Sequence, residues 1–271
     1  FAADWDAWTW LPQPALIAFA LSGLALLALA GWRRTPVDLA LPAVLAAGAL
    51  ALHAVGRGGL PALFFTAAAL APLAALLMDA WRMAFIDDLT GLPGRRALNQ
   101  SLRGLGRRYA IAMVDIDHFK AFNDTHGHDV GDQVLRMVAA RLSRVGGGGR
   151  AHRYGGEEFA ILFPGRTVDQ TRPVLEALRA AMADEPFRLR GPTRRRPEDE
   201  EAGRRRRGSG AESPGVRVTV SIGVAERTGD KPTPQAVIQA ADRALYQAKR
   251  VGRNRVVADR AGLEGVLSPA A

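Results

Sequence analysis

Three long uncharged stretches near the N-terminus set the first limit on how this chain can fold. Residues 11–32, 37–55 and 60–78 consist mainly of Ala, Leu, Val and Pro and are almost free of charge. A helix of about 20 apolar residues crosses the roughly 30 Å hydrocarbon core of a bilayer. Such helices offer no polar face to water, and each is longer than the apolar part of a cleaved signal peptide. We therefore predict a transmembrane region over residues 1–82 with three spans.

Charged residues beside these stretches predict how the spans are oriented. Arg33, Arg34 and Arg82 lie on one side, against only Arg57 on the other. Because Lys and Arg are enriched in cytoplasmic loops, three spans place the N-terminus outside and everything after Arg82 in the cytoplasm. Tryptophans before the first span, and after the first and third, are typical of interfacial aromatic belts.

The rest of the chain carries most of the charged residues, and its pattern is typical of one α/β domain over residues 83–260. Cysteine is absent, which excludes disulfides, thiolate metal sites and a cysteine nucleophile. Residues 261–271 form a C-terminal tail. Apolar spacing predicts helices over 95–105, 129–145, 167–185 and 234–251, and strands over 109–117, 150–153, 159–163, 216–225 and 254–258.

An Arg-rich segment contributes much of the net charge of +9. Between Arg188 and Arg217, ten arginines stand against five acidic residues. Residues 191–215 are rich in Arg, Pro, Glu and Gly and cannot bury a core, so they predict a disordered insertion. The simplest interpretation is that the segment binds nothing specific. Beside a membrane, its charge favours anionic lipid over DNA, so we expect membrane lipid and no nucleic acid as a partner.

Gly155 and Gly156 stand between two short predicted strands and are followed by Glu157 and Glu158. A Gly-Gly pair supplies the positive φ angles of a tight two-residue hairpin and leaves the backbone open to a ligand. Carboxylates beside such a turn suit a metal ion that carries phosphates. An ordinary exposed hairpin with charged shoulders would have the same pattern, so both interpretations stay open at this point.

A second pair of carboxylates ends the most apolar predicted strand. Residues 109–114 are nearly all apolar, as expected of a central strand buried on both faces. Asp115 and Asp117 follow and point to one side of the sheet. Buried carboxylates are costly unless they bind something, so a metal ion is the economical explanation. A solvated strand end is the alternative.

Two groups of polar side chains could complete a nucleotide site. Asn123 and Asp132 could read a purine edge, the carboxylate accepting hydrogen bonds from guanine, and His128 lies between them. Helix capping is a competing role for Asp132. Lys249 and Arg253 lie at the end of the last predicted helix, where they could hold triphosphate oxygens or complement the helix dipole.

Taken together, these features resemble the GGDEF family of diguanylate cyclases over about residues 85–260. One such block would be a weak signal, but their number and order make the resemblance specific. The matching blocks are Asp87-x-Leu-Thr-Gly-Leu-Pro, Asp115-Ile-Asp-x-Phe-Lys, Asn123, Gly127-His, Gly131-Asp, Arg153-Tyr-Gly-Gly-Glu-Glu-Phe, Ser221-Ile-Gly-Val and Ala244-Leu-Tyr-x-Ala-Lys-x-x-Gly-Arg-Asn.

The resemblance implies a palm-like α/β (α+β) domain with a mainly antiparallel central sheet flanked by helices. It also implies that two GTP are condensed into cyclic di-GMP with release of pyrophosphate, in bacterial second-messenger signalling at the inner membrane. The family uses Mg²⁺ or Mn²⁺. Each active site holds one GTP, so a homodimer is required for catalysis.

The resemblance also assigns roles to residues. Asp115, Glu157 and the Ile116 carbonyl match the metal positions, and either Glu157 or Glu158 could assist deprotonation of the attacking hydroxyl. The substrate positions are Asn123 and Asp132 on guanine, His128 in the same segment, Phe119, Lys120, Lys249 and Arg253 on the phosphate side, and Gly155 and Gly156 in the turn.

Two features depart from the family pattern. An Arg-x-x-Asp block that binds inhibitory product often precedes the hairpin in this family, and its positions are Gly146 and Gly149 here. We therefore expect that inhibitory site to be absent. Gly94 stands where the family usually has Asn, which predicts only a small loss of helix capping.

Two other functions stay open beside an active cyclase. A GGDEF domain without activity could serve as a nucleotide receptor or interaction module, although every metal and base position is present here. A sister cyclase could use other purine nucleotides, but Asp132 at the guanine position favours GTP.

Overall fold

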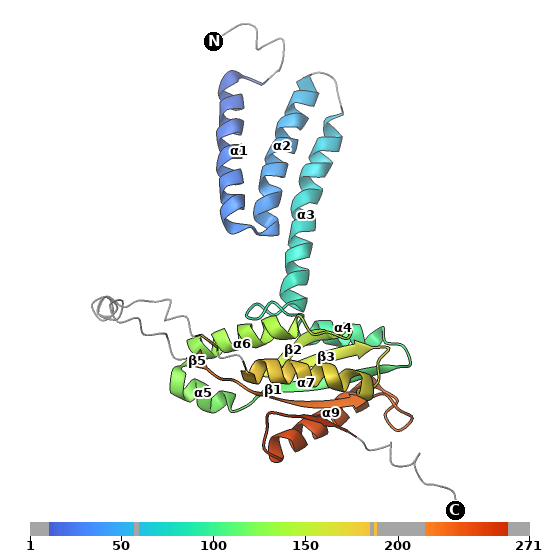
Figure 1. The fold of residues 1–271 in the computed structure, drawn as a ribbon. Helices are drawn as coiled ribbons and strands as arrows, with labels where there is room; N and C mark the ends of the chain where they lie inside the picture. The colour runs from blue at the N-terminus through green and yellow to red at the C-terminus, as the bar shows by residue number, and fades with distance from the viewer. Residues whose placement is uncertain (1–10, 57–59, 185–186, 189–214, 260–271) are drawn as a thin grey trace, which may run out of the picture. The chain divides into compact units, whose positions relative to one another are not determined.

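The computed structural model describes residues 11–56, 60–184, 187–188 and 215–259 (Figure 1). Two compact units divide the chain between Ala84 and Phe85. Nearly all of the predicted insertion at 191–215, and the tail at 261–271, lie outside the described residues.

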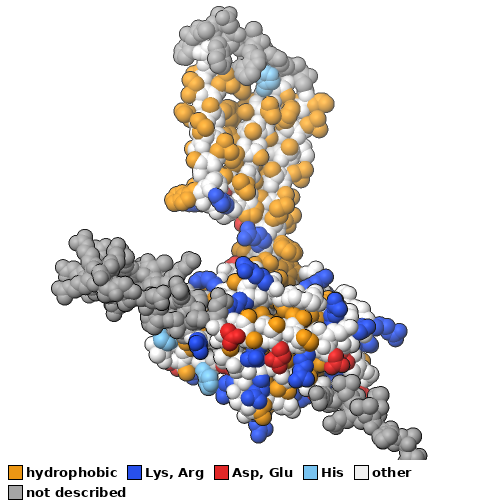
Figure 2. All heavy atoms as spheres, viewed as in Figure 1, with side chains coloured by type: hydrophobic (Ala, Val, Ile, Leu, Met, Phe, Trp, Pro, Cys, Tyr) orange, Lys and Arg blue, Asp and Glu red, His pale blue; other side chains and the backbone are white. Residues whose placement is uncertain are grey.

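The first unit consists of three helices long and apolar enough to cross a membrane, at the three predicted places. They are α1 (Gln13–Arg33), α2 (Pro36–Gly56) and α3 (Pro61–Phe85). Large apolar side chains are exposed along them, and Leu21, Leu24 and Leu63 each expose more than 60% of their surface. Figure 2 shows hydrophobic side chains covering these helices, whereas charged side chains gather on the second unit. An apolar surface of this extent suits lipid rather than water.

The second unit is an α+β domain built on a five-stranded sheet. Its strands follow the order β2-β3-β1-β6-β7, and only the pairing of β6 with β7 is parallel. The prediction of a mainly antiparallel sheet is thus confirmed. The strand bounds are β1 (Tyr109–Ile116), β2 (Arg150–Gly155), β3 (Glu158–Pro164), β6 (Val220–Glu226) and β7 (Val256–Ala258).

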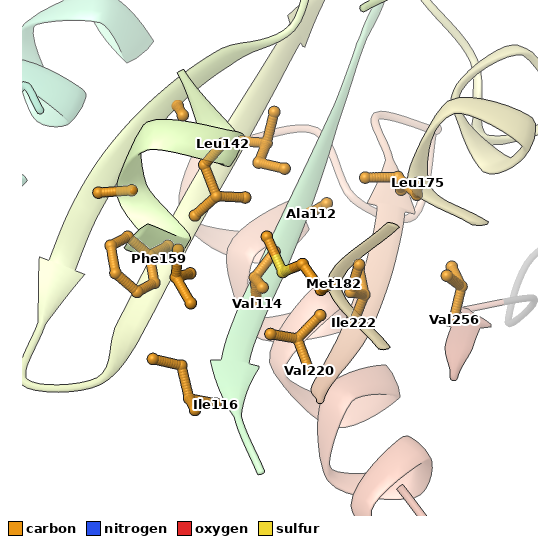
Figure 3. Close-up of a cluster of buried hydrophobic side chains, with 14 of the residues drawn as sticks. Ala112, Val114, Ile116, Leu142, Phe159, Leu175, Met182, Val220, Ile222 and Val256 are labelled. Atoms are coloured by element: carbon orange, nitrogen blue, oxygen red, sulfur yellow. The ribbon is translucent and has the colours of Figure 1, made fainter. Parts of the chain in front are cut away.

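Helices cover both faces of this sheet, and the alternation of side chains along β1 decides which face each residue enters. Ala112, Val114 and Ile116 pack with α6 (His128–Leu142) and α7 (Val168–Asp184) in the larger core cluster, part of which Figure 3 shows. Tyr109, Ile111 and Met113 pack on the other face with α4 (Arg95–Arg103) and α9 (Pro234–Arg250). Every residue of β1 is buried, as predicted for a central strand.

Helix α9 approaches the sheet closely at Gly223 in β6. A Cβ atom at Gly223 would lie 2.1 Å from the Ala241 carbonyl oxygen and 2.1 Å from the Leu245 nitrogen. Only glycine therefore lets the helix backbone rest directly on the strand. This contact sets the height of α9 above the sheet, and with it the position of Lys249 in the last turn of the helix.

The structure corrects the sequence prediction in two places. Residues 119–126 form a separate helix, α5 (Phe119–His126), which the prediction missed. The predicted strand 216–225 is interrupted: β5 (Gly215–Val216) pairs with β4 (Phe187–Arg188), and β6 begins only at Val220. Other predicted helix and strand ends differ from the observed ones by one to three residues, which is the usual uncertainty of element boundaries.

Candidate active site at the ends of strands β1 and β3

Three carboxylates gather where β1 and β3 end. Asp115 pairs with Glu158 in the antiparallel register, so their side chains leave the same face of the sheet. Glu157 lies one residue earlier, in the turn between β2 and β3. Asp115 is only 4% exposed, whereas Glu157 and Glu158 are half-buried. A groove of about 700 Å³ opens beside Glu158 and Lys249.

The Gly-Gly turn differs in detail from its prediction. Gly155 belongs to β2 and pairs with Glu158, so the two-residue loop consists of Gly156 and Glu157. Only Gly156 has a positive φ, of 49°, whereas positive values were predicted for both glycines. A Cβ atom at Gly155 or Gly156 would meet nothing within 4 Å. The backbone of the turn is therefore open, which leaves room for a ligand.

Arg153 holds this turn in place, and all three nitrogens of its guanidinium group donate hydrogen bonds. Its Nη1 donates to both carboxylate oxygens of Asp87, at 2.7 and 2.9 Å. Its Nε and Nη2 donate to the Gly156 carbonyl oxygen, at 3.2 and 2.8 Å. Asp87 also accepts from the Thr90 amide and hydroxyl. Such two-sided use of an Arg fork gives a geometrically specific link, so this clasp holds the turn in one position.

Lys249 reaches the carboxylates from α9. Its Nζ lies 2.8 Å from Asp115 Oδ2. Burial raises the pKa of Asp115, although the Lys249 ammonium and the more distant Arg253 work against that rise. Burial also raises the pKa of Glu157 and of Glu158, and repulsion from Asp115 adds to both shifts. Burial thus disfavours the charged form of all three carboxyls, and a bound cation would favour that form.

Asp117, the second acid after the apolar strand, raises the pKa of Asp115 through its charge but has hydrogen-bond partners of its own. It accepts hydrogen bonds from the hydroxyls of Thr219, at 2.7 Å, and Ser221, at 2.6 Å, and from the Asn254 amide, at 3.0 Å. Its burial is thus compensated by protein donors, and no metal is needed to explain it.

The predicted guanine side lies on the paired helices α5 and α6. The Oδ1 atom of Asn123 is buried without a hydrogen-bond partner. A Cβ atom at Gly131 would come within 1.8 Å of it, so the lack of a side chain at Gly131 is what admits the Asn123 amide. Asp132 follows directly on α6 and is half-buried, whereas His128 is exposed at the start of that helix.

The remaining predicted substrate residues are distributed around this region. Phe119 and Lys120 open α5, immediately after His118, which adopts the left-handed conformation with φ of 58°. Phe119 is buried, and Lys120 is exposed. Arg253 is half-buried in the tight turn after α9. Within the part of the chain that the structure describes, no hydrogen bond or ion pair joins them to the carboxylates, although the charge of Arg253 acts to lower the pKa of Asp115.

The donor set suits a metal ion that arrives with phosphates. Among the described residues, no three His, Cys, Asp or Glu side chains converge closely enough to enclose a metal. Mg²⁺ is usually bound through one or two carboxylates together with substrate phosphates and water. Asp115 and Glu157, whose charges interact across the turn, supply two carboxylates of this kind. The residues present therefore fit such an ion.

Comparison with known proteins shows the family to which the chain belongs. The sequence profile described as "Diguanylate cyclase, GGDEF domain" matches residues 84–196 and 206–255. The chain therefore belongs to the GGDEF diguanylate cyclase domain family. It is 37% identical over 188 residues to the diguanylate cyclase DgcP of Pseudomonas aeruginosa, a match covering 66% of this chain and 25% of that protein. It is 37% identical over 183 residues to the response regulator PleD of Caulobacter vibrioides, covering 65% of this chain and 36% of that protein.

Solved structures show the same fold. The coiled coil and GGDEF domain of DgcB from Caulobacter crescentus, in complex with c-di-GMP, aligns with a TM-score of 0.59 and 34% identity, over 72% of this chain and 96% of that one. The diguanylate cyclase SiaD of Pseudomonas aeruginosa, in complex with its activator SiaC, aligns with a TM-score of 0.53 and 34% identity. The chain spans only 25% of the length of DgcP and 36% of the length of PleD.

The Asp87–Arg153 clasp leads to a pH-dependent prediction. Burial works to raise the pKa of Asp87, but hydrogen bonds from Thr90 and Arg153 outweigh it and lower that pKa below 3.8. A lowered folded-state pKa stabilises the protein above the unfolded value and loses that stabilisation as the pH falls through the folded value. We expect Asp87→Asn to cost about 1 kcal/mol at neutral pH, discounted for partial solvent exposure, and less below about pH 4.

This is measured by thermal unfolding of the full chain in detergent between pH 3 and 7. Glu176→Gln is the control, because it removes a half-buried ion pair with Arg179 within one helix. A loss of stability for Asp87→Asn that is equal at all pH values would contradict the prediction.

Proposed function

We propose that this chain is a membrane-anchored diguanylate cyclase that condenses two GTP into cyclic di-GMP and pyrophosphate. The observation that carries the proposal is the meeting of Asp115, Glu157, Glu158 and Lys249 at an open glycine turn, in a chain of the GGDEF family. The three apolar helices support an anchor in a bacterial inner membrane, with lipid around them and the second unit in the cytoplasm.

In the proposed reaction, the 3′-hydroxyl of one GTP attacks the α-phosphorus of another. The bond from that phosphorus to the pyrophosphate oxygen breaks, and two such steps close the ring. A divalent ion held by Asp115, Glu157 and the Ile116 carbonyl would lower the pKa of the attacking hydroxyl and screen the triphosphate. Mg²⁺ and Mn²⁺ both suit these oxygen ligands.

The chain's own residues would then handle the proton and the leaving group. Glu157 or Glu158 would accept the proton of the 3′-hydroxyl, and the raised pKa of both carboxyls suits a general base. Lys249 and Arg253, with Lys120 and the main chain at Phe119, would offset the charge that develops on the leaving pyrophosphate.

Each domain offers one group of carboxylates and one pair of guanine-reading positions. One domain therefore holds one GTP, and each new bond forms between nucleotides on two facing domains. A homodimer would accordingly be part of the mechanism. In a membrane-bound chain, anchoring restricts the domains to a layer at the surface, which raises the effective concentration of one for the other.

The test of the proposed function is synthesis by the purified full chain. Wild type with Mg²⁺ and GTP should form cyclic di-GMP, identified by mass spectrometry, and ATP alone should give no dinucleotide. Asp115→Asn and Glu157→Gln should each lower kcat at least about a hundredfold, because each removes charge stabilisation in the transition state. Gly106→Ala, where a Cβ meets nothing within 4 Å, should retain wild-type activity.

No dinucleotide from wild type would overturn the proposal in favour of an inactive receptor or interaction module. Undiminished synthesis by Glu157→Gln would also contradict it. Products that contain adenine would indicate a cyclase for other purine nucleotides.

A second prediction concerns the guanine side. Gly131→Ala should displace the Asn123 amide, because the new methyl would overlap Oδ1 at 1.8 Å. We expect KM for GTP to rise about tenfold, and kcat to change less, since the contact would form in both ground and transition states. Gly106→Ala is the matched control, because a Cβ there meets nothing within 4 Å. An unchanged KM for Gly131→Ala would show that Asn123 does not contribute to guanine recognition.

A third prediction concerns feedback by product. Gly149 stands at the acidic position of the family's inhibitory block, and its Cβ would come within 2.7 Å of Phe163 and 2.8 Å of Val145. Because a side chain does not fit there, an Asp could not be restored without moving the core. We expect calorimetry to show no tight cyclic di-GMP binding at residues 146–149. Tight binding that is lost on changing this loop would contradict the prediction.

A further inference from the structure

Asp117 links three separate segments of the second unit through one buried carboxylate, which is 8% exposed. Oδ2 accepts from the Thr219 hydroxyl at 2.7 Å and from the Asn254 amide at 3.0 Å. Oδ1 accepts from the Ser221 hydroxyl at 2.6 Å. The Asp117 amide donates in turn to the Thr219 carbonyl oxygen at 2.9 Å. All of these donors are neutral, so the carboxylate is held by geometry rather than by a counter-charge.

The Asn254 amide, one of these donors, belongs to the turn after α9, and the backbone of this turn is unusual. Gly252, Arg253 and Asn254 have φ values of 112°, 59° and 43°, so three successive residues lie on the positive side. Residues with side chains adopt this conformation only where the surroundings hold them in it. Besides Asp117, the turn is held by the Arg253 amide on the Ala248 carbonyl, by Arg255 Nε on the Arg253 carbonyl at 3.0 Å, and by Arg179 on the Asn254 side chain at 2.8 Å.

Asp117 therefore ties the turn that carries Arg253 to the end of the strand that carries Asp115. Asp115 and Asp117 are two residues apart and lie on the same side of the sheet. Without this link, the position of Arg253 relative to the carboxylates would rest on the remaining bonds of the turn and on the pairing of β7 with β6. With it, the turn that carries Arg253 is bonded directly to the end of the strand that carries Asp115.

The geometry points to Asp117 as a positioning residue, which acts on the triphosphate through Arg253 and does not itself bind metal or nucleotide. This inference rests on the proposed function, since Arg253 is assigned to the phosphates there. It also explains why two acids end β1: one faces the site, and the other holds the loop that completes it.

The pattern of bonds predicts which substitution is tolerated. In Asp117→Asn, an amide oxygen at the Oδ2 position can still accept from Thr219 and Asn254. The amide nitrogen at the Oδ1 position can donate to the Ser221 hydroxyl, which can turn to accept. All three links survive without the negative charge. Asp117→Ala removes them all, so the two variants separate a positioning role from a metal-binding one.

The experiment uses the full chain in detergent with 3′-deoxy-GTP and Mg²⁺, a probe that lacks the attacking hydroxyl and cannot react. Affinity is measured for wild type, Asp117→Asn, Asp117→Ala, Arg253→Ala and the Asp117→Ala/Arg253→Ala double variant. Hydrogen exchange of the peptide over residues 251–258 reports directly on the turn, and thermal unfolding reports on folding. Thr219→Val serves as a milder variant that removes one link if Asp117→Ala does not fold.

We expect Asp117→Ala and Arg253→Ala each to weaken binding about tenfold, the double variant to bind no worse than Arg253→Ala, and Asp117→Asn to bind like wild type. Such non-additivity identifies residues that act as one unit. Exchange over 251–258 should rise in Asp117→Ala and Thr219→Val but not in Asp117→Asn.

Three results would overturn the inference. Losses that add in the double variant would show that Asp117 acts independently of Arg253. Failure of Asp117→Asn to bind would show that the charge itself is needed, as for a metal ligand. Unchanged hydrogen exchange over residues 251–258 in Asp117→Ala and Thr219→Val would show that Asp117 does not hold this turn. If wild type binds the probe and forms no cyclic di-GMP, the proposed function fails, while the binding cycle and the exchange still decide the role of Asp117.

Discussion

The cost of burying carboxylates at the end of an apolar strand governs the second unit. β1 is buried along its whole length, so Asp115 near its end lies in the interior, where an unpaired charge is strongly disfavoured. The fold compensates with Lys249, which reaches Asp115 only because α9 rests directly on β6 at Gly223. The close packing of α9 on β6, at Leu245 beside the groove, is thus what allows Lys249 to balance the charge of Asp115.

Much of this arrangement was predictable from the sequence, because the signals are local. The three apolar stretches, the buried β1 and the carboxylates around Gly155 and Gly156 depend on residue type and spacing, and the structure has each of them at its predicted place. The position of the Gly-Gly turn followed from its flanking strands. Which glycine bears the positive φ did not, because that depends on where the pairing of Gly155 with Glu158 closes the ladder.

The features that the sequence did not reveal depend on contacts between distant segments. Helix α5 has few apolar residues, and it begins after a left-handed His118 and ends at Gly127 with φ of 85°, so its short pattern resembles a loop. The donors to Asp117 lie 102 to 137 residues away along the chain. No spacing rule distinguishes its role from that of Asp115. The close contact of Gly131 with Asn123 is equally invisible, because glycine in a helix has many explanations.

The same charge balance bears on what the site does when a substrate enters. Lys249 forms an ion pair with Asp115 at 2.8 Å, yet the proposed function assigns Lys249 to the triphosphate, and one ammonium cannot fully serve two anions. A triphosphate that draws Lys249 away would leave a buried carboxylate without its partner, at a cost that grows with burial. Binding is then favourable only if the nucleotide arrives with a cation that replaces Lys249 at Asp115. Under the proposed function, the ion pair would therefore couple metal and nucleotide binding, since either ligand alone would disturb the balance that the other restores.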